Sequence, residues 1–136
     1  MHDLEMMKQK TKCALELLFN SDVSYEQKAK DITAYINPNK YIQHSPELED
    51  GLQGLMKLVK HFDETLVGYS IDVKLVLAEG DHSMAHCLYR FGPDDRGKAI
   101  VEIFRFENNM MVEHWDVIQE VPETEATGNA NGNGMF

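Results

Sequence analysis

Three polar residues in the last apolar hairpin of the sequence could together move a proton. Glu102 lies in the apolar run 100–106, and His114 and Asp116 lie in a second run, 110–117. Side chains alternate between the two faces of a strand, so His114 and Asp116 share a face. A carboxyl group in a desolvated pocket can act as both acid and base when its pKa is drawn toward neutrality. Asp116 is therefore the candidate acid/base residue; an aspartate that only holds a strand end in place is an equally weighted alternative.

The turn between the two runs decides whether Glu102 joins this group. Asn108-Asn109 suits a turn because Asn tolerates positive φ. A two-residue turn would pair Val101 with Asp116. A three-residue loop with Asn109 in the left-handed region would pair Glu102 with His114 and place Glu102 on the Asp116 face. We favour the second register, since it gathers four residues on one surface: Glu102, Phe104, His114 and Asp116.

Two further histidines could supply polar groups to a pocket. His86 shares the parity of Met84 and Leu88 in a predicted strand, so we expect it to face inward, where a lone His is more often a satisfied core residue than a catalyst. We expect His44, shortly before Pro46, to lie at the pocket mouth and to bond a substrate carbonyl or orient Asp116. A simple hydrogen bond between loop and sheet is the alternative for His44.

A metal site is the weaker interpretation of these side chains. His44, His86 and His114 with Glu102 or Asp116 are suitable ligand types, and ligands from separate strands can converge. The sequence has no local ligand spacing such as His-Glu-x-x-His. We therefore expect neither a metal nor another cofactor.

The elements that must position these residues follow from hydrophobic periodicity. Apolar residues at helical spacing predict helices over 3–19, 24–36 and 50–67, and the second and third open on the capping patterns Ser24-x-x-Gln27 and Asp50-x-x-Gln53. The period then changes to two over 70–78 and 82–91, before the hairpin. Three helices followed by antiparallel strands predict an α+β fold, with the helices on one face of a curved sheet.

The length and charge of the chain limit the number of domains and the kinds of partner. A chain of 136 residues fits one domain, over residues 1–122, and the net charge of −10 argues against nucleic acid as a partner. No stretch approaches the length needed to span a bilayer, so we expect a soluble, cytoplasmic protein with no membrane partner. Residues 123–136 read as a flexible tail, although the closing Met135-Phe136 could dock on this protomer or on a partner protomer.

Four segments together resemble a known family. Tyr41-Ile42-Gln43-His44-Ser45-Pro46, Asp50-Gly51-Leu52-Gln53-Gly54-Leu55, Glu102-Ile103-Phe104-Arg105 and Val112-Glu113-His114-Trp115-Asp116-Val117 resemble the SnoaL-like polyketide cyclases of the nuclear-transport-factor-2-like superfamily. The likeness is greatest to the predicted aldol-condensation-catalysing subset. The resemblance implies a cone-shaped α+β barrel, in which a strongly curved antiparallel sheet wraps around helices and leaves an internal pocket, usually in a homodimer.

The resemblance also implies a role for Asp116. In cyclases of this family, an aspartate in the pocket is the general acid/base of an intramolecular aldol closure that needs no metal or cofactor, and Asp116 matches it by position. Three positions depart from the family pattern: Ser45 stands where many relatives have Asn, Asn109-Met110 where many have Gly-Lys, and Glu102 where a cyclase can carry His. The departure at Glu102 puts the cyclase substrate in doubt.

The first hypothesis is a small cofactor-independent enzyme for aldol condensation, cyclisation or isomerisation of a carbonyl compound in an apolar pocket. Its catalytic group is Asp116, with His44 and His86 as polar pocket groups. The remaining substrate-binding candidates are Tyr41, Met84, Glu102, Phe104 and His114. The alternative is a non-catalytic dimeric module of the same fold that binds a small apolar ligand or a protein, because fold alone does not choose among these.

Overall fold

The chain begins with helices and ends with strands, as the periodicity predicts. The structure is a computed structural model that describes residues 3–123, 128 and 134–136. Its elements are, in order, α1 (Leu4–Leu18), α2 (Tyr25–Asp31), the 3₁₀ turn η1 (Ile32–Ala34), β1 (Ile42–Gln43), α3 (Gly51–Thr65), β2 (Ser70–Glu79), β3 (His82–Arg90), β4 (Lys98–Glu107) and β5 (Met110–Glu120). The predicted α+β class is confirmed.

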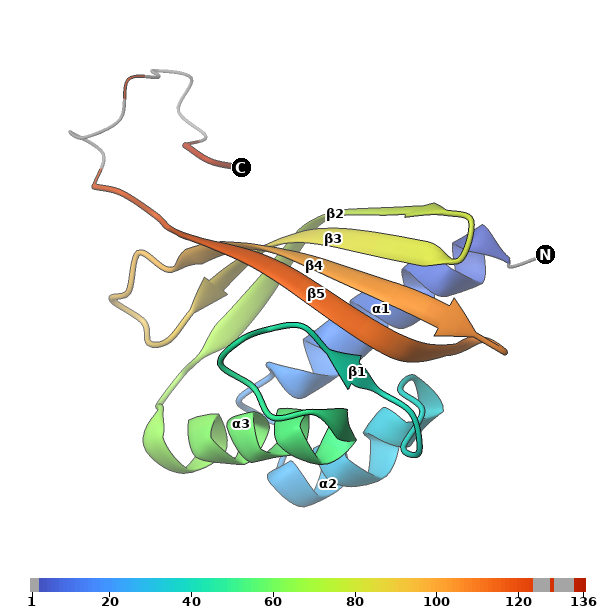
Figure 1. Ribbon diagram of the computed structural model, residues 1–136. Coiled ribbons are helices and arrows are strands. Elements are labelled where there is room, and N and C mark those ends of the chain that lie inside the picture. Colours follow the sequence, from blue (N-terminus) through green and yellow to red (C-terminus); the bar gives the residue numbers. More distant parts are fainter. Residues whose placement is uncertain (1–2, 124–127, 129–133) are drawn as a thin grey trace.

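The strands form one curved sheet in the order β1-β5-β4-β3-β2, with the helices on its concave side (Figure 1). Strands β2 to β5 are antiparallel, but β1 runs parallel to β5, with Ile42 opposite Glu113 and Gln43 opposite His114. The expectation of an antiparallel sheet is therefore wrong at this edge. A two-residue strand is too short to show a period-two pattern, yet it brings Gln43 to the side of His114.

The β4–β5 hairpin combines a tight turn with a bulge. Asn108 and Asn109 both have positive φ, 49° and 65°, which fits a two-residue turn that pairs Glu107 with Met110. Phe106 then pairs with Met111 and Arg105 with Glu113, so Val112 is an extra residue in β5. This bulge shifts the register, so Glu102 lies opposite Asp116 and Phe104 opposite His114. Both pairings considered from the sequence are wrong, but the four residues do share one face.

The loop before α3 is held tightly against that helix. Ser24 caps α2 as predicted, since its Oγ accepts the backbone N–H of Gln27. Asp50 is the N-cap residue of α3, but its Oδ1 instead accepts the backbone N–H of Gln43, at 2.8 Å. A Cβ at Gly54 would lie 1.9 Å from the carbonyl oxygen of Glu49, so only glycine permits this approach. The loop that carries Ser45 and Glu47 is thereby fastened to α3.

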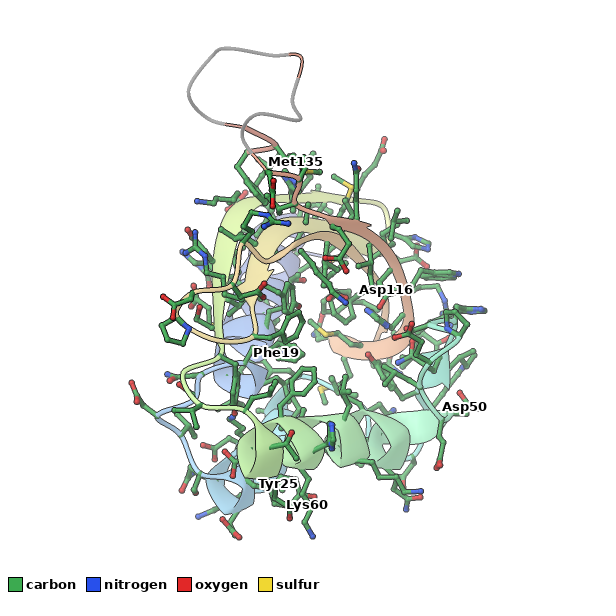
Figure 2. The ribbon with its side chains drawn as sticks, turned by 90° about the vertical axis from the view of Figure 1, so that its left-hand side faces the viewer. Phe19, Tyr25, Asp50, Lys60, Asp116 and Met135 are labelled. Atoms are coloured by element: carbon green, nitrogen blue, oxygen red, sulfur yellow. The ribbon has the colours of Figure 1, made fainter. Side chains whose placement is uncertain are left out.

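The concave side of the sheet faces α1 and α3. Small residues of β3, Ser83, Ala85 and Cys87, leave room for α1, and the Thr11 hydroxyl lies 2.6 Å from that of Ser83. Figure 2 shows the arch of the sheet with Asp116 on this inner side. The core continues through fully buried residues from helices and strands: Met7, Val59, Ile32, Ile36, Phe106 and Met111.

The convex side carries apolar residues in contact with solvent. Leu75, Leu77 and Val117 are 47%, 50% and 63% exposed. At the end of the chain, the Phe136 ring stacks on His86 of this face, with the ring centroids 5.2 Å apart, and Met135 lies on the same outer side in Figure 2. Most of the predicted tail, residues 124–127 and 129–133, lies outside the described residues.

Among the residues that the structure describes, none of the helices has the length and apolar character needed to cross a bilayer.

Candidate active site

A cavity of about 450 Å³ lies between the concave face of the sheet and helices α1 and α3. Most of its wall is apolar and comes from both helices and from β4: Leu15, Leu18, Phe19, Leu55, Leu58, Phe62, Ile100 and Phe104. Polar side chains gather at one end. There Glu102 from β4 and His114 and Asp116 from β5 meet Tyr41 and Ser45, which flank β1, and Tyr89 from β3. An apolar pocket with a few convergent polar groups is the usual form of a small-molecule site.

A buried Glu102–His114 pair forms the floor of this polar end. His114 Nε2 bonds Glu102 Oε2, and the Tyr89 hydroxyl donates to Glu102 Oε1 at 2.7 Å. On its other side, His114 Nδ1 lies 2.7 Å from Gln43 Oε1. That amide oxygen also accepts the backbone N–H of Ser45, so Nδ1 must carry the proton that it donates to Gln43. Both carboxylate oxygens of Glu102 are thus occupied.

The protonation of His114 depends on Glu102. Burial disfavours the charged imidazolium, but the charge and hydrogen bond of the Glu102 carboxylate more than offset it, and Asp116 adds to the effect. The pKa of His114 is therefore raised above its ordinary value. With Nδ1 donating to Gln43 and Nε2 facing a carboxylate, the imidazolium form satisfies both ring nitrogens.

Asp116 is the carboxyl group that faces the cavity. It lies directly across the hairpin from Glu102 and is half-buried. Burial raises the pKa of Asp116 above that of an ordinary aspartate, and the negative charges of Glu102 and Glu47 raise it further. His114 and a hydrogen bond with Ser45 oppose this shift without cancelling it. A carboxyl group held closer to neutrality in this way can both accept and return a proton.

Two tyrosines complete the polar end. Burial and the charges of Glu102 and Asp116 hold the pKa of Tyr41 and that of Tyr89 well above the ordinary value, so both phenols stay protonated. The Tyr89 hydroxyl is committed to Glu102. The Tyr41 hydroxyl has no hydrogen-bond partner among the residues that the structure describes, although Tyr41 lines the cavity. Tyr41 can therefore donate a hydrogen bond to a ligand.

The same group of side chains could hold a divalent cation. Glu102, His114 and Asp116 each offer a ligand atom, and these atoms lie within 4.8 Å of one another. The Nδ1 contact to Gln43 and the Tyr89 contact to Glu102 resemble the outer hydrogen bonds that orient metal ligands. An ion would, however, have to displace the proton that His114 Nε2 donates to Glu102, because a metal binds the lone pair that this proton occupies.

The structure brings together five of the predicted site residues, which all line the cavity: Tyr41, Glu102, Phe104, His114 and Asp116. It places three others on the convex face. Met84 and His86 do share a face of β3, but the inward face is that of Ala85, Cys87 and Tyr89. Their predicted inward orientation is wrong, because both faces of β3 are apolar and parity could not choose between them.

His44 is also outside the cavity, so the expectation that it lies at the pocket mouth and bonds the substrate or Asp116 is wrong. Its ring stacks on Trp115 at 4.8 Å between centroids, and its Nε2 lies 3.0 Å from Glu113 Oε1. Position 44 follows Gln43 in β1, and adjacent residues of a strand point to opposite faces. Since Gln43 reaches inward to His114, His44 must point outward. The alternative of a loop-to-sheet hydrogen bond describes it correctly.

Sequence reasoning missed Tyr89, Gln43 and the hydrogen-bonding role of Ser45. Tyr89 has the parity of Cys87 and Ala85, and their small side chains are the available signal that this face packs against a helix. Gln43 reaches the site only through the parallel pairing of β1 with β5, which no local pattern indicates.

Comparisons with known proteins identify the fold. No protein-family model and no curated protein matches the chain. Solved structures do match. A candidate ketosteroid isomerase from Kribbella flavida is 11% identical, with 97% of this chain and 95% of that chain covered and a TM-score of 0.71. A candidate isomerase of the SnoaL-like family from Agrobacterium tumefaciens is 11% identical, with 85% and 99% covered and a TM-score of 0.69.

A third structure, a nuclear-transport-factor-2-like protein of unknown function from Burkholderia xenovorans, is 20% identical, with 91% and 89% of the two chains covered and a TM-score of 0.65. At these identities the likeness concerns the backbone, and the functions of the neighbours are not transferred by it. The chain has the curved α+β fold that SnoaL-like and nuclear-transport-factor-2-like proteins share.

Proposed function

We propose that the protein is an enzyme that moves a proton at the carbon next to a carbonyl group, without a metal or cofactor. The observation that carries the proposal is Asp116, a half-buried carboxyl group with a raised pKa at the polar end of an apolar cavity. Perturbed carboxyl groups in such positions are characteristic of acid/base sites. The alternative, an aspartate that only braces a strand end, does not account for its exposure to the cavity.

Each residue of the polar end has a distinct task. The Asp116 carboxylate takes the proton from the α carbon, and the electron pair of the C–H bond moves toward the carbonyl oxygen to form an enolate. The free Tyr41 hydroxyl donates a hydrogen bond to that oxygen. Glu102 is less suited to act as the base, because its two oxygens already accept from Tyr89 and His114. The Glu102–His114 pair instead holds the site in shape.

The enolate is the intermediate that several reactions share. It can regain a proton at another carbon, which is isomerisation, or its α carbon can attack a second carbonyl, which is aldol condensation or cyclisation. The fold neighbours include candidate isomerases, which supports the first of these as well as the chemistry that the family resemblance implies. The substrate we propose is a small, largely apolar carbonyl compound, in keeping with the apolar wall.

Hydrogen–deuterium exchange tests the proposal without knowledge of the natural substrate. Methyl aryl ketones such as 4-acetylbiphenyl are incubated with the protein in deuterated buffer, and loss of the acetyl proton signal is followed by NMR. We expect catalysed exchange with the wild type and a fall of about 10²-fold or more for Asp116→Asn, since general acid/base groups contribute on that scale. Thermal stability should be unchanged or higher, because a desolvated carboxylate is removed.

The matched control is Asp72→Asn, which changes an exposed aspartate of β2 paired with Lys74. This variant should exchange protons as fast as the wild type. Equal rates for Asp116→Asn and the wild type would overturn the proposal. Ketone binding without any exchange would instead favour the alternative of a non-catalytic binding module.

We further propose that two copies of the chain associate through the convex face of the sheet. The exposed apolar residues Leu75, Leu77 and Val117 support this, because several large apolar side chains exposed on one face of a sheet are typical of an interface. Light scattering should give twice the mass of one chain for the wild type and the mass of one chain for Leu77→Lys. The matched variant Val67→Lys, at an exposed position after α3, should remain dimeric. A monomeric wild type would refute the association.

A further inference from the structure

The two ends of the cavity carry opposite charge. Glu47, Glu102 and Asp116 gather at the polar end, and the imidazolium of His114 offsets only one of them. At the other end the wall includes Lys98, at the start of β4, and His61, on the last turns of α3. A ligand in this cavity therefore meets acidic groups at one end and a lysine at the other.

Lys98 lies on the same face of β4 as the acidic end. Lys98, Ile100, Glu102 and Phe104 alternate along the strand, and all four line the cavity. Lys98 and Glu102 are four positions apart, which corresponds to about 13 Å of extended strand. The apolar side chain of Ile100 lies between them. The separation fits an elongated ligand with an apolar middle and a different polar group at each end.

The surroundings of Lys98 leave its charge available. Its Nζ lies 5.3 Å from the centroid of the Phe91 ring, and 3.5 Å from Glu120 Oε1. Glu120 is 78% exposed, so this pair is a weak surface contact that a ligand can replace. Phe91, which follows β3, contacts Phe62, the neighbour of His61, so α3 and the end of β3 close this end together. The contact with the Phe91 ring holds the ammonium group of Lys98 beside the apolar wall.

We propose that the natural ligand carries a carboxylate that pairs with Lys98, with its reactive carbonyl at the Asp116 end. The acidic groups Glu47, Glu102 and Asp116 repel a carboxylate from the polar end, so the ligand binds in one direction. The enolisable carbon is thereby delivered to Asp116. The inference rests on the proposed function for the identity of the reactive end, but the pairing with Lys98 is a statement about binding alone.

Two matched compounds test the pairing with Lys98 separately from the proposed reaction at Asp116. The keto acid 4′-acetylbiphenyl-4-carboxylate has an enolisable acetyl group and a carboxylate at opposite ends of a rigid apolar body, and its methyl ester has the same body with an uncharged ester in place of the carboxylate. Dissociation constants are measured by calorimetry or NMR titration for both compounds. We expect the wild type to bind the keto acid more tightly than the ester, by about threefold or more, with the preference falling as salt is added.

Lys98→Met should remove this preference, because the acid loses affinity while the affinity for the ester is retained. Lys98→Glu should reverse the preference. The control Lys74→Met, on the convex face, should keep the preference of the wild type. Equal affinity of the wild type for acid and ester, or an equal loss of both with Lys98→Met, would overturn the inference. Failure of the proposed function has a different signature: the keto acid binds with the Lys98 preference, but its acetyl protons do not exchange.

Discussion

The β4–β5 region carries two carboxylate–histidine pairs on opposite faces of one sheet. The Glu102–His114 pair faces the cavity, and its side chains are 8% and 6% exposed. The Glu113–His44 pair lies on the convex face, where the two side chains are 16% and 41% exposed. Glu113 and His114 are neighbours in the sequence, so a single step along β5 separates the two environments. The residue types are the same, and only the face differs.

The difference in environment leads to a difference in chemistry. On the concave side, low solvent exposure keeps the attraction to Glu102 unscreened, and it raises the pKa of His114 despite burial. On the convex side, Glu113 is first of all the partner of Arg105, at 2.6 Å, and hydrogen bonds to Arg105 and His44 lower the pKa of Glu113. The inner pair is next to a carboxyl group that can take a proton. The outer pair braces the sheet surface beside Trp115.

The largest expected effect is on the free energy of unfolding, when each carboxylate–histidine pair is broken in turn. Glu102→Ala leaves the imidazole of His114 and the hydroxyl of Tyr89 buried without their partner, so we expect the free energy of unfolding to fall by about 3 kcal/mol or more. Glu113→Ala removes a partly exposed contact, and we expect a loss below about 1 kcal/mol. Urea or guanidinium titration measures both. Equal losses for the two variants would show that the faces do not differ in the way that burial indicates.

A smaller effect should appear in the pH dependence of stability. The folded-state pKa of His114 is raised above its ordinary value of 6.5, so its stabilising contribution is complete below pH 6.5 and is lost as the pH rises through the folded-state pKa. We expect the free energy of unfolding to fall over this window by at most about 1.4 kcal/mol per pH unit.

Two variants sharpen this comparison of the faces. In His114→Asn, the free energy of unfolding should no longer fall above pH 6.5. In His44→Asn the fall should remain, because His44→Asn leaves the Glu102–His114 pair in place. Denaturant titrations at a series of pH values measure the slope. If the fall in unfolding free energy disappears with His44→Asn and persists with His114→Asn, the titrating group lies on the convex face. That result would contradict the description of the inner pair.

The smallest expected effect concerns metals. If the inner group acts by acid/base chemistry alone, dialysis against EDTA should leave the rate of ketone exchange unchanged, and added Zn²⁺ should not increase it. A metal bound by Glu102, His114 and Asp116 would instead make the rate depend on the ion. Loss of exchange on dialysis, restored by a divalent cation in the wild type but not in His114→Asn, would replace the metal-free mechanism.

Local patterns predicted the elements because each one depends on neighbours in the sequence. The helix over 50–67 corresponds to Gly51–Thr65, and the strand over 82–91 corresponds to His82–Arg90. The ion pair between Arg105 and Glu113 is also local to the hairpin. Asp116 and His114 have the same parity in one strand, so the sequence placed them on one face without further information.

The register of the strands, and which face of each strand points inward, could be determined only from the tertiary structure. The bulge at Val112 brings Glu102 opposite Asp116, and it has no local signature that distinguishes it from a longer turn loop. Likewise, β1 needs β5 as its partner before Gln43 can reach His114.

By itself, the sequence determined that this protein has helices before strands and that Glu102, His114 and Asp116 lie on its last hairpin. Only the tertiary structure decided which of them meet. A period of two says which side chains lie together, but not which side is inside, and β3 is apolar on both of its faces. Helix α1 packs on the side of Ser83, Ala85 and Cys87, and this packing puts Tyr89 in the site and His86 on the outer surface. The inner face of a strand is a property of what packs against it, and that partner is distant in the sequence.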